Sequence, residues 1–434
     1  MNSNKNIMNI YSYAQLQGNF TDNVGLSHPD WMLLQPKKTE RYNTIQLEFG
    51  KHKNLSDDDW HKDDVIEVGL NPKLSRNFRD RPFEFHGSAD SVLKTIAKRG
   101  QRVLFLSLMD CWGFEYNSKD NDYHIIEDIY WVCDHYGIDL DRVAVCTGNA
   151  TLEEECIRIA EKVNRPVIKN FYYNTYYLRI PLVPREIDTS LIQYKFLFTN
   201  RRHTDARFEI LHYLKRNDML DSTVWSYNNV MQQTTATPME KDIAGYLIGR
   251  NDTSKIFEAF EQHHVKWIVG NTPKTLDRSG RDFPADWQDS LPNVFYDKAG
   301  VYIIQETNFE PYSELQDGYP TFLRGWHSEK SLKTFLKRMP AIFFAAPHHL
   351  DSLKKVGYKT FDSMIDESYD DEIDSNIRFS KAANELNRIH HMDYNELYDA
   401  LERLRPVLEH NYNTYIQYSN IDYYKNKVHT LFNT

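Results

Sequence analysis

SADSVLKTIAKRGQRVLFLSLMD, residues 88–110, joins a helical pattern that ends at Gly100 to an apolar run typical of a buried strand. A second strand pattern, DVIEVGL at 64–70, comes before it. Strand, helix and strand in this order make a β-α-β unit, from which parallel sheets are built. The stretch therefore predicts an α/β protein.

The same alternation continues along the chain. We expect helices at 123–136 and 151–163, and Thr151 with Glu154 has the spacing of a capping box at the start of the second helix. A new series of strands then begins, with KFLFTN at 195–200, VKWIVG at 265–270, GVYIIQET at 300–307 and AIFFAA at 341–346. Long helical patterns fill residues 374–434. Two Rossmann-like halves in tandem are the simplest architecture for this order.

The length of the chain indicates more than one domain, because 434 residues exceed what a single hydrophobic core usually holds. We expect an N-terminal α/β domain at 1–190, a C-terminal α/β domain at 191–373 and helices at 374–434 that brace the two. VPREIDTS, at 183–190, is the best candidate for the linker between the domains.

The composition is that of a globular, soluble protein, with 41% hydrophobic and 26% charged residues. No apolar run approaches the roughly 18 to 20 residues that cross a bilayer, and the polar N-terminus resembles no secretion signal. We therefore expect no membrane span and a location in the cytosol, or in the host cytoplasm if a phage encodes the chain. The four cysteines are expected to be buried thiols: Cys111, Cys133, Cys146 and Cys156.

HSEKSLKTFLKRM, from residue 327, places a carboxylate and an ammonium at the start of a helix. Helix N-termini attract anions, so a pyrophosphate fits beside Ser328 and Lys330, while Glu329 can accept hydrogen bonds from ribose hydroxyls. This is what a sugar nucleotide requires. The alternative is that Ser328 only caps the helix and that the next two side chains are solvated.

A second candidate anion site follows the strand at 195–200. NRRHTDAR places Asn200, Arg201, Arg202 and Arg207 at the carboxyl end of that strand, where open α/β sheets bind ligands. Guanidinium groups bind phosphate through paired hydrogen bonds. In the alternative interpretation, Arg207 pairs with a neighbouring carboxylate inside its helix.

Three acidic runs have carboxylates close enough in sequence to suggest a metal site. DESYDD at 366–371 lacks the spacing and the glycine of a calcium loop, and an acidic turn that caps the following helix predicts the same residues. DLD at 139–141 and DDD at 57–59 lie in polar turns and not directly after an apolar strand. The sequence therefore predicts no metal site.

Three of these segments carry a resemblance that spans about residues 195 to 390. The stretch around SEK resembles the donor motif of fucosyltransferase-like GT-B enzymes, in which Thr/Ser-Glu-Lys opens a helix. VGYKTFDSMIDESYDDEID, at 356–374, and KFLFTNRRHTDARFEILHYL, from 195, resemble a glycosyltransferase-like family common in phage genomes. The resemblance implies a GT-B glycosyltransferase with a nucleotide sugar as co-substrate, no other cofactor and no metal for chemistry. The first domain matches no motif.

An inverting transfer needs a general base within reach of the acceptor hydroxyl, in the first domain. Asp110, at the end of the strand in the opening stretch, is the best candidate, followed by Glu115 and His86. A retaining mechanism needs no such base, and the residues do not decide between the two.

Two acceptors fit the resemblance equally, a hydroxymethylated base in phage DNA and a glycan. The basic residues near the end of the helix that begins at Ser328 can follow a phosphate backbone: Lys330, Lys333, Lys337 and Arg338. The formal net charge of -10 favours the glycan.

Two other functional classes remain open. One is a noncatalytic phage or cell-surface assembly protein that keeps the fold as a binding module, and the other is a nucleic-acid-binding protein. Failure to bind any nucleotide sugar would favour the first, and a salt-dependent shift of duplex DNA would favour the second.

Overall fold

The computed structural model describes most of the chain from residue 121 onward and several segments before it. The described residues are 10–12, 65–70, 87–107, 115–118, 121–174, 176–180, 182–200, 205–227, 262–272, 276, 291–306, 309 and 325–433. The chain divides into two compact units. Unit 1 comprises Met1–Arg179, Arg324–Trp326 and Gln417–Thr434, and unit 2 comprises Ile180–Leu323 and His327–Ile416.

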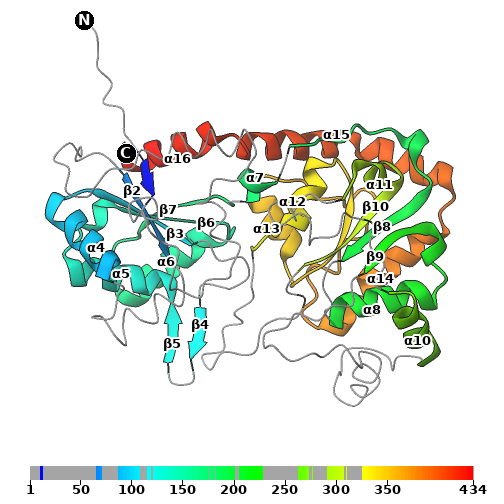
Figure 1. The fold of residues 1–434 in the computed structure, drawn as a ribbon, viewed down its shortest axis with the longest axis horizontal. Helices are drawn as coiled ribbons and strands as arrows, with labels where there is room; N and C mark the ends of the chain where they lie inside the picture. Colours follow the sequence, from blue (N-terminus) through cyan, green and yellow to red (C-terminus); the bar gives the residue numbers. More distant parts are fainter. Residues whose placement is uncertain are drawn as a thin grey trace, which may run out of the picture. The chain divides into compact units, whose positions relative to one another are not determined.

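Unit 1 contains a parallel sheet (Figure 1). Its strands, in their order across the sheet, are β1 (Ile10–Ser12), β2 (Val65–Leu70), β3 (Arg102–Ser107), β6 (Val143–Thr147) and β7 (Lys169–Tyr172). Each strand pairs in parallel with the next, so among the described strands the order across the sheet follows the order along the chain. The strands predicted at 64–70 and in the apolar run from Arg102 are confirmed within this sheet.

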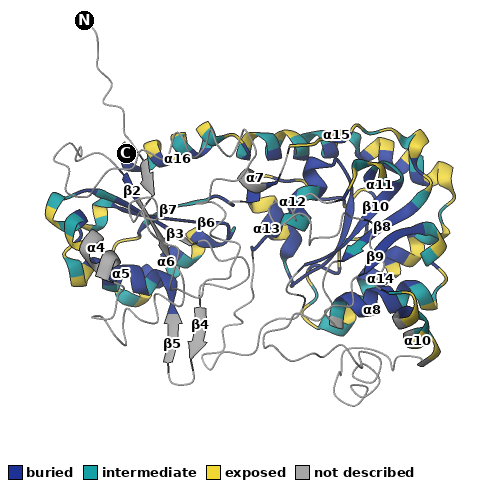
Figure 2. Cartoon of the chain, viewed as in Figure 1, coloured by how far each residue is buried: buried dark blue, intermediate teal, exposed yellow. Residues whose placement is uncertain are grey.

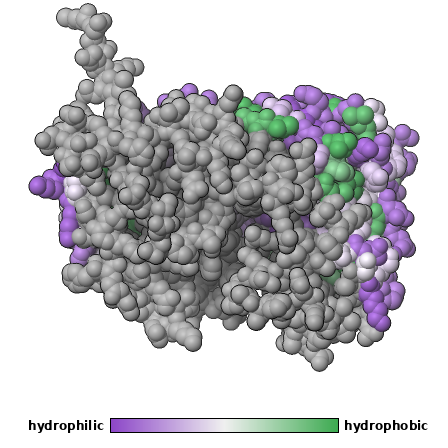
Figure 3. All heavy atoms as spheres, viewed as in Figure 1, coloured by the Kyte–Doolittle hydropathy of each residue, from purple (hydrophilic) through white to green (hydrophobic). Residues whose placement is uncertain are grey.

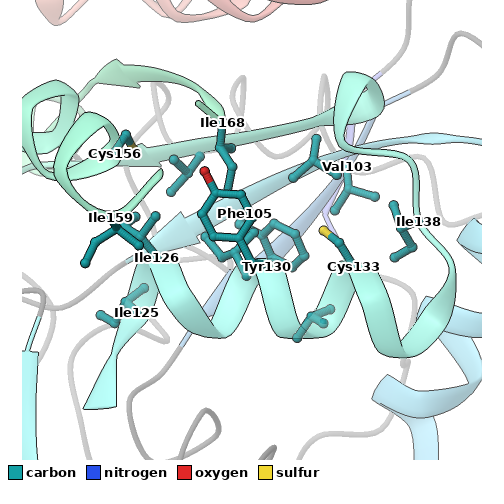
Figure 4. Packing of buried hydrophobic residues seen from close by; sticks show 14 of the residues in the cluster. Val103, Phe105, Ile125, Ile126, Tyr130, Cys133, Ile138, Cys156, Ile159 and Ile168 are labelled. Atoms are coloured by element: carbon teal, nitrogen blue, oxygen red, sulfur yellow. The ribbon is translucent and has the colours of Figure 1, made fainter. Parts of the chain in front are cut away.

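Helices cover one face of this sheet: α4 (Gly87–Arg99), α5 (Ile125–Tyr136) and α6 (Leu152–Val163). Side chains alternate between the faces of a strand, so Val103 and Phe105 point to the same side. Figure 4 shows these two packed with Ile126, Tyr130 and Ile159 from the helices. The alternation of apolar residues on β3 and the helical periodicity of α5 and α6 together build this core.

The remaining elements of unit 1 are short or lie near the C-terminus. They are β4 (Glu115–Ser118), β5 (Asn121–His124), the turn η2 (Leu140–Arg142), α7 (Tyr176–Arg179) and α16 (Ile421–Asn433). The ring of Tyr424 on α16 lies 4.8 Å from that of Tyr173, between ring centroids, and the Arg102 guanidinium lies over Phe432. The C-terminal helix therefore packs within unit 1.

Local signals explain the ends of α5 but not the start of α6. The His124 side chain accepts a hydrogen bond from the Ile126 N–H, and Gly137 closes α5 in the left-handed conformation. The predicted capping box at Thr151 is wrong, because the Thr151 side chain makes no capping hydrogen bond. Its hydroxyl instead donates to Asn149 Oδ1 at 2.9 Å.

Three described cysteines are buried free thiols, as expected: Cys133, Cys146 and Cys156. Burial raises the pKa of Cys133 and of Cys156 to about 12, so both remain protonated near neutral pH. Cys111 lies outside the described residues.

Gly325 lies against the N-terminus of α6 and is expected to be intolerant of any side chain. Its carbonyl accepts the Ala150 N–H at 2.8 Å, its φ is +79°, and an added Cβ would lie 2.6 Å from Asn149 Oδ1. We expect Gly325→Ala to lower the free energy of unfolding by about 3 kcal/mol, because backbone strain and a steric clash add together. Chemical denaturation monitored by circular dichroism measures this loss.

Gly137→Ala is the matched control in the same unit. Gly137 has a φ of +69° but nothing within 4 Å of an added Cβ, so only the backbone strain remains, about 1 kcal/mol. Equal losses for the two variants would contradict the close approach at Gly325.

Unit 2 also contains a parallel sheet, but its strand order reverses. The strands are β8 (Tyr194–Asn200), β9 (Thr223–Tyr227), β10 (Ala299–Gln305) and β11 (Ala341–Phe344), arranged as β11-β10-β8-β9. All neighbouring pairs are parallel. From β8 the chain moves to one side to form β9, and then returns to form β10 on the other side. Figure 2 shows these strands mostly buried.

Helices cover both faces of the unit 2 sheet. Each connection between parallel strands is right-handed, so two connections that run in opposite directions across the sheet place their helices on opposite faces. Accordingly, α8 (Asp205–Arg216), between β8 and β9, contacts Gln305 through Arg207, whereas α12 (Glu329–Leu336), between β10 and β11, contacts Glu306 through Ser331. Consecutive residues of an extended chain point to opposite faces, which agrees with this arrangement.

Other described elements complete unit 2. They are η3 (Thr189–Leu191), η4 (Leu220–Ser222), α10 (Gln262–Gly270), α11 (Asn293–Asp297), α13 (His349–Lys355), α14 (Ser375–His391) and α15 (Tyr394–Tyr418), of which the last two residues belong to unit 1. Two sheets of parallel strands flanked by helices confirm the α/β class. No helix of the described ranges combines the length and apolarity that crossing a bilayer requires.

The strand predicted at 265–270 is wrong, because this segment is helical in α10. The Trp267 ring packs against Trp225 of β9, and the Lys215 ammonium of α8 lies 4.7 Å from the Trp267 ring centroid. Packing against these neighbours overrides the preference of β-branched and aromatic residues for strands.

The surface seen in Figure 3 is mostly hydrophilic where described residues are coloured, with smaller green apolar areas. Large apolar side chains are exposed at a few described positions, including Val183, Leu191, Val294 and Ile377. Exposed apolar residues of this kind are ordinary on a folded protein.

Candidate functional site

The strand order of unit 2 reverses between β8 and β10 (Figure 1). The polar residues Asn200 and Gln305 end these two strands. The β8–β10 register pairs Leu197 with Tyr302, so its continuation places Asn200 beside Gln305. Ligands of open α/β sheets bind outside the carboxyl ends of the strands where the order reverses. This end of unit 2 is therefore the candidate site.

Asn200 contributes a hydrogen-bond donor at the end of β8. It is 5% exposed, and its Nδ2 is buried with no hydrogen-bond partner among the residues that the structure describes. A buried amide without a partner costs about 1–3 kcal/mol, so such groups in folded proteins call for a specific explanation. A bound ligand that accepts a hydrogen bond is one such explanation.

Arg207 lies on α8, on the same face of the sheet as Gln305. It is 7% exposed, and its Nε donates to Gln305 Oε1 at 2.8 Å. Part of the guanidinium thus joins α8 to the end of β10. This contact places Arg207 beside Gln305, at the carboxyl end of β10.

The helix α12 begins as predicted at Ser328-Glu329-Lys330. Ser328 is the N-cap, and its hydroxyl accepts a hydrogen bond from the Lys330 N–H at 3.2 Å. The Lys330 ammonium lies 3.4 Å from the same hydroxyl and 3.7 Å from Glu329 Oε1. The side chains of Glu329 and Lys330 are 15% and 19% exposed to solvent, so both are partly buried yet accessible to a ligand.

Glu306, directly after β10, is the main residue of this site that sequence reasoning missed. It is 4% exposed, and its Oε1 accepts hydrogen bonds from the Ser328 N–H at 3.3 Å and from the Ser331 hydroxyl. The nearby Lys330 ammonium opposes the effect of burial and helps to hold the pKa of Glu306 at about 2. The only sequence signal was an acidic residue at the end of a predicted strand.

Two histidines extend this buried network. His349 Nε2 lies 3.2 Å from the Ser331 hydroxyl, and His327 Nε2 lies 2.8 Å from the Ser352 hydroxyl. Burial lowers the pKa of both imidazoles, which therefore favours their neutral forms. Among the described residues, the Lys330 ammonium contributes most to holding Glu306 in its ionised form.

The ionised Glu306 predicts a loss of stability in acid. Its folded pKa of about 2 lies below the ordinary 4.5, so its contribution is present above pH 4.5 and is lost as the pH falls through 2. At 1.36 kcal/mol per pKa unit, the full contribution is about 3 kcal/mol, and about 2 kcal/mol of it disappears between pH 6 and pH 3.

Urea unfolding of the wild-type chain and of Glu306→Gln at both pH values tests this expectation. The wild-type chain is expected to lose about 2 kcal/mol more than the variant between pH 6 and pH 3. Burial raises the pKa of Asp370 to about 7 and lowers the pKa values of His327 and His349, and these groups titrate in both proteins. Identical losses would show that Glu306 is not ionised in the way its contacts imply.

The basic end of α12 does not form a phosphate-binding surface in the way the sequence suggested. Lys337 is 1% exposed and donates to the Val183 carbonyl at 2.7 Å and to Asn293 Oδ1 at 2.6 Å. Arg338 is 8% exposed, donates to the Arg185 carbonyl and pairs with Glu409 at 2.8 Å. Both cationic side chains bind partners inside unit 2.

The acidic run at 366–371 has a structural role in the described structure. Glu367 accepts the Phe361 N–H, and the Tyr369 hydroxyl accepts the Phe343 N–H of β11. Asp370 accepts the Leu350 N–H, so it caps α13, the helix before it and not the one after it. The following helix α14 is capped by Asp374.

One group of possible metal ligands occurs among the described residues, formed by His348, Asp351 and Asp371 with ligand atoms within 4.8 Å of one another. Two of its three members are exposed carboxylates that the imidazole pairs with loosely, at 3.6–3.7 Å. Such a group is common on surfaces without an ion, so it does not define a metal site. The run at 139–141 overlaps η2, where Asp139 caps the turn.

Several predicted residues lie outside the described part of the chain. Arg201, Arg202, Asp110 and His86 belong to this group, as does the acidic run at 57–59. Glu115 begins β4, paired with His124 of β5, but its side chain is not described. Within unit 2, Asn200 and Arg207 lie at the carboxyl ends of β8 and β10. Ser328, Glu329 and Lys330 begin α12, whose N-cap contacts Glu306 directly after β10.

The geometry separates the site into two sides. Beside α8 lie an amide donor and a guanidinium, and beside α12 lie two carboxylates with one ammonium. Such an arrangement can bind a molecule that carries both an anionic group and hydroxyl groups.

The chain matches no family model, curated protein or solved structure among those with which it was compared.

Proposed function

We propose that the chain is a glycosyltransferase that transfers a sugar from a nucleotide sugar to an acceptor hydroxyl, with the donor bound in unit 2. The reversal of strand order between β8 and β10 carries the proposal, because it brings Asn200 and the Ser328-Glu329-Lys330 helix start to one end of the sheet. Dinucleotide-type ligands bind at this place in Rossmann-like folds. In this proposal the two units are the Rossmann-like domains of a GT-B enzyme.

The chemistry of a nucleotide sugar fits the groups at this site. Its diphosphate needs hydrogen-bond donors and positive charge, which Asn200 and Arg207 supply and which Arg201 and Arg202 are proposed to increase. Its ribose and sugar hydroxyls need acceptors, which the Glu329 carboxylate supplies. Ser328 and Lys330 fix the start of the helix that presents Glu329.

The acceptor is proposed to be a hydroxyl group of a glycan or of a hydroxymethylated DNA base. The glycan is favoured, because Lys337 and Arg338 are buried and because the net charge of -10 repels a phosphate backbone. Asp110 remains the proposed general base for an inverting reaction, with Glu115 and His86 as the other candidates.

A panel of nucleoside diphosphate sugars tests the donor. We expect one member to raise the thermal unfolding temperature and to be transferred, or slowly hydrolysed, by the purified chain. Acceptors in the same assay are glycans and DNA that contains hydroxymethylated bases. If no member of the panel binds, the enzyme proposal is wrong.

The same assay separates the two alternatives. Binding of a nucleotide sugar without transfer or hydrolysis would indicate a noncatalytic binding module. A salt-dependent mobility shift of unmodified duplex DNA, without any effect of nucleotide sugars, would indicate a nucleic-acid-binding protein.

A further inference from the structure

The N-terminus of α12 already holds an anion that the chain itself supplies. Glu306 Oε1 accepts the N–H of the N-cap residue Ser328 at 3.3 Å and the hydroxyl of Ser331, three residues further along the helix. In a capping box, a carboxylate from the third helical position binds the N-cap N–H. Here a carboxylate from the end of β10 takes that place.

This carboxylate is charged, and the Lys330 ammonium, 3.4 Å from the Ser328 hydroxyl, helps to balance it. Glu306 is 4% exposed, and the neighbouring Lys330 favours its ionised form despite burial. Lys330 also lies 3.7 Å from Glu329 Oε1. Of these three described groups, the two carboxylates of Glu306 and Glu329 outnumber the single ammonium of Lys330.

A diphosphate beside the start of α12 would therefore meet a fixed negative charge. Like charges at contact distance repel each other, and more strongly where water is scarce. The N-terminus of α12 already interacts with the Glu306 carboxylate, so it attracts an external anion less. The α12 side suits neutral hydroxyl groups, which donate hydrogen bonds to carboxylates.

The opposite face of the sheet has the complementary chemistry. Asn200 Nδ2 is a buried donor with no partner among the described residues, and Arg207 is held beside it through Gln305. Neither an amide donor nor a guanidinium repels phosphate.

We propose that Glu306 is a positioning residue that occupies the anion position of α12, neutralises Lys330 and so assigns the diphosphate to the Asn200 side of the site. The hydroxyl groups of the donor are left to Glu329. The inference rests on the proposed function for the identity of the ligand. It differs from the expectation, drawn from the sequence, that the start of α12 itself binds the pyrophosphate.

Inorganic pyrophosphate is the probe that tests this division, because it carries the anionic group without the sugar or the nucleoside. Calorimetric titration compares the wild-type chain with Lys330→Gln, Asn200→Ala, Glu306→Gln and the double variant Glu306→Gln/Lys330→Gln. In the wild-type background, Lys330→Gln is expected to change the pyrophosphate Kd less than threefold, and Asn200→Ala is expected to weaken binding at least fivefold.

Glu306→Gln keeps the shape of the side chain and an oxygen for Ser328, but removes the charge. It is expected to tighten pyrophosphate binding about tenfold, because Lys330 is no longer neutralised. Lys330→Gln added to this background is then expected to weaken binding about tenfold. If Glu306 has only a structural role, Glu306→Gln will lower the stability of the chain. The effect of Lys330→Gln on pyrophosphate affinity will then be the same with and without Glu306→Gln.

Two outcomes would overturn the inference. One is a loss of pyrophosphate affinity of tenfold or more for Lys330→Gln in the wild-type background. This result would place the phosphate beside α12 even while Glu306 is ionised. The other is no pyrophosphate binding by any of the proteins. Because no sugar donor is used, a failure of the nucleotide-sugar panel leaves these results interpretable, and the two proposals can fail separately.

Discussion

Replacing Glu329 by alanine is expected to reduce sugar transfer at least about 100-fold, which corresponds to about 2.7 kcal/mol of transition-state stabilisation. The Glu329 side chain, at the start of α12, is only 15% exposed to solvent, so a hydroxyl that it binds is shielded from most water. Without the carboxylate, that hydroxyl stays unpaired in a partly desolvated site. Initial rates with the nucleotide sugar found in the panel measure the loss.

Asp399→Ala is the matched control, because Asp399 is an exposed carboxylate on α15 in the same unit. Its transfer rate is expected to equal that of the wild-type chain. Mass spectrometry of DNA and lipid-linked glycans from cells that express each protein identifies the acceptor at the same time. Unchanged transfer by Glu329→Ala would remove Glu329 from the proposed donor site.

Arg378→Met is expected to destabilise unit 2 by about 3 kcal/mol or more. Arg378 is 1% exposed and donates to the Ala345 carbonyl at 3.0 Å and to the Glu372 carbonyl at 2.7 Å. It also donates to the carbonyls of Ile373 and Phe309. Each buried carbonyl left without a donor costs about 1–3 kcal/mol, and methionine replaces none of these hydrogen bonds.

Lys381→Met, on the same helix, is the control for the loss of a positive charge. Lys381 is 39% exposed and pairs with Glu372 at 3.0 Å, a surface ion pair of a kind worth less than about 1 kcal/mol. Urea denaturation curves of the three proteins give the comparison. If both variants lose the same free energy, the carbonyl contacts of Arg378 do not hold unit 2 together.

Local sequence patterns predicted most of the described elements. The apolar run from Arg102 formed β3, and the Ser328 cap set the start of α12 at the predicted residue. Both features depend on residues a few positions apart, which a short window of sequence contains. The helix at 262–270 escaped prediction because its contacts with Trp225 and Lys215 come from distant segments.

The candidate site was predicted only in part, for the same reason. Asn200 and Lys330 were recognisable from their places beside a strand and a helix. Glu306 was not, since its role depends on Ser328, 22 residues later in the chain, and on Ser331. The role of Arg378 was equally hidden, because its buried acceptors, the Ala345 and Phe309 carbonyls, lie 33 and 69 residues earlier in the chain.

The sequence by itself determined the α/β class, the start of α12 and the polar residues at the strand ends, because periodicity and capping are properties of neighbouring residues. Only the tertiary structure decided that the strand order reverses between β8 and β10, and that Glu306 fills the N-terminus of α12. Strand order and the partners of a buried charge depend on which distant segments meet. That choice is made by the packing of the whole unit.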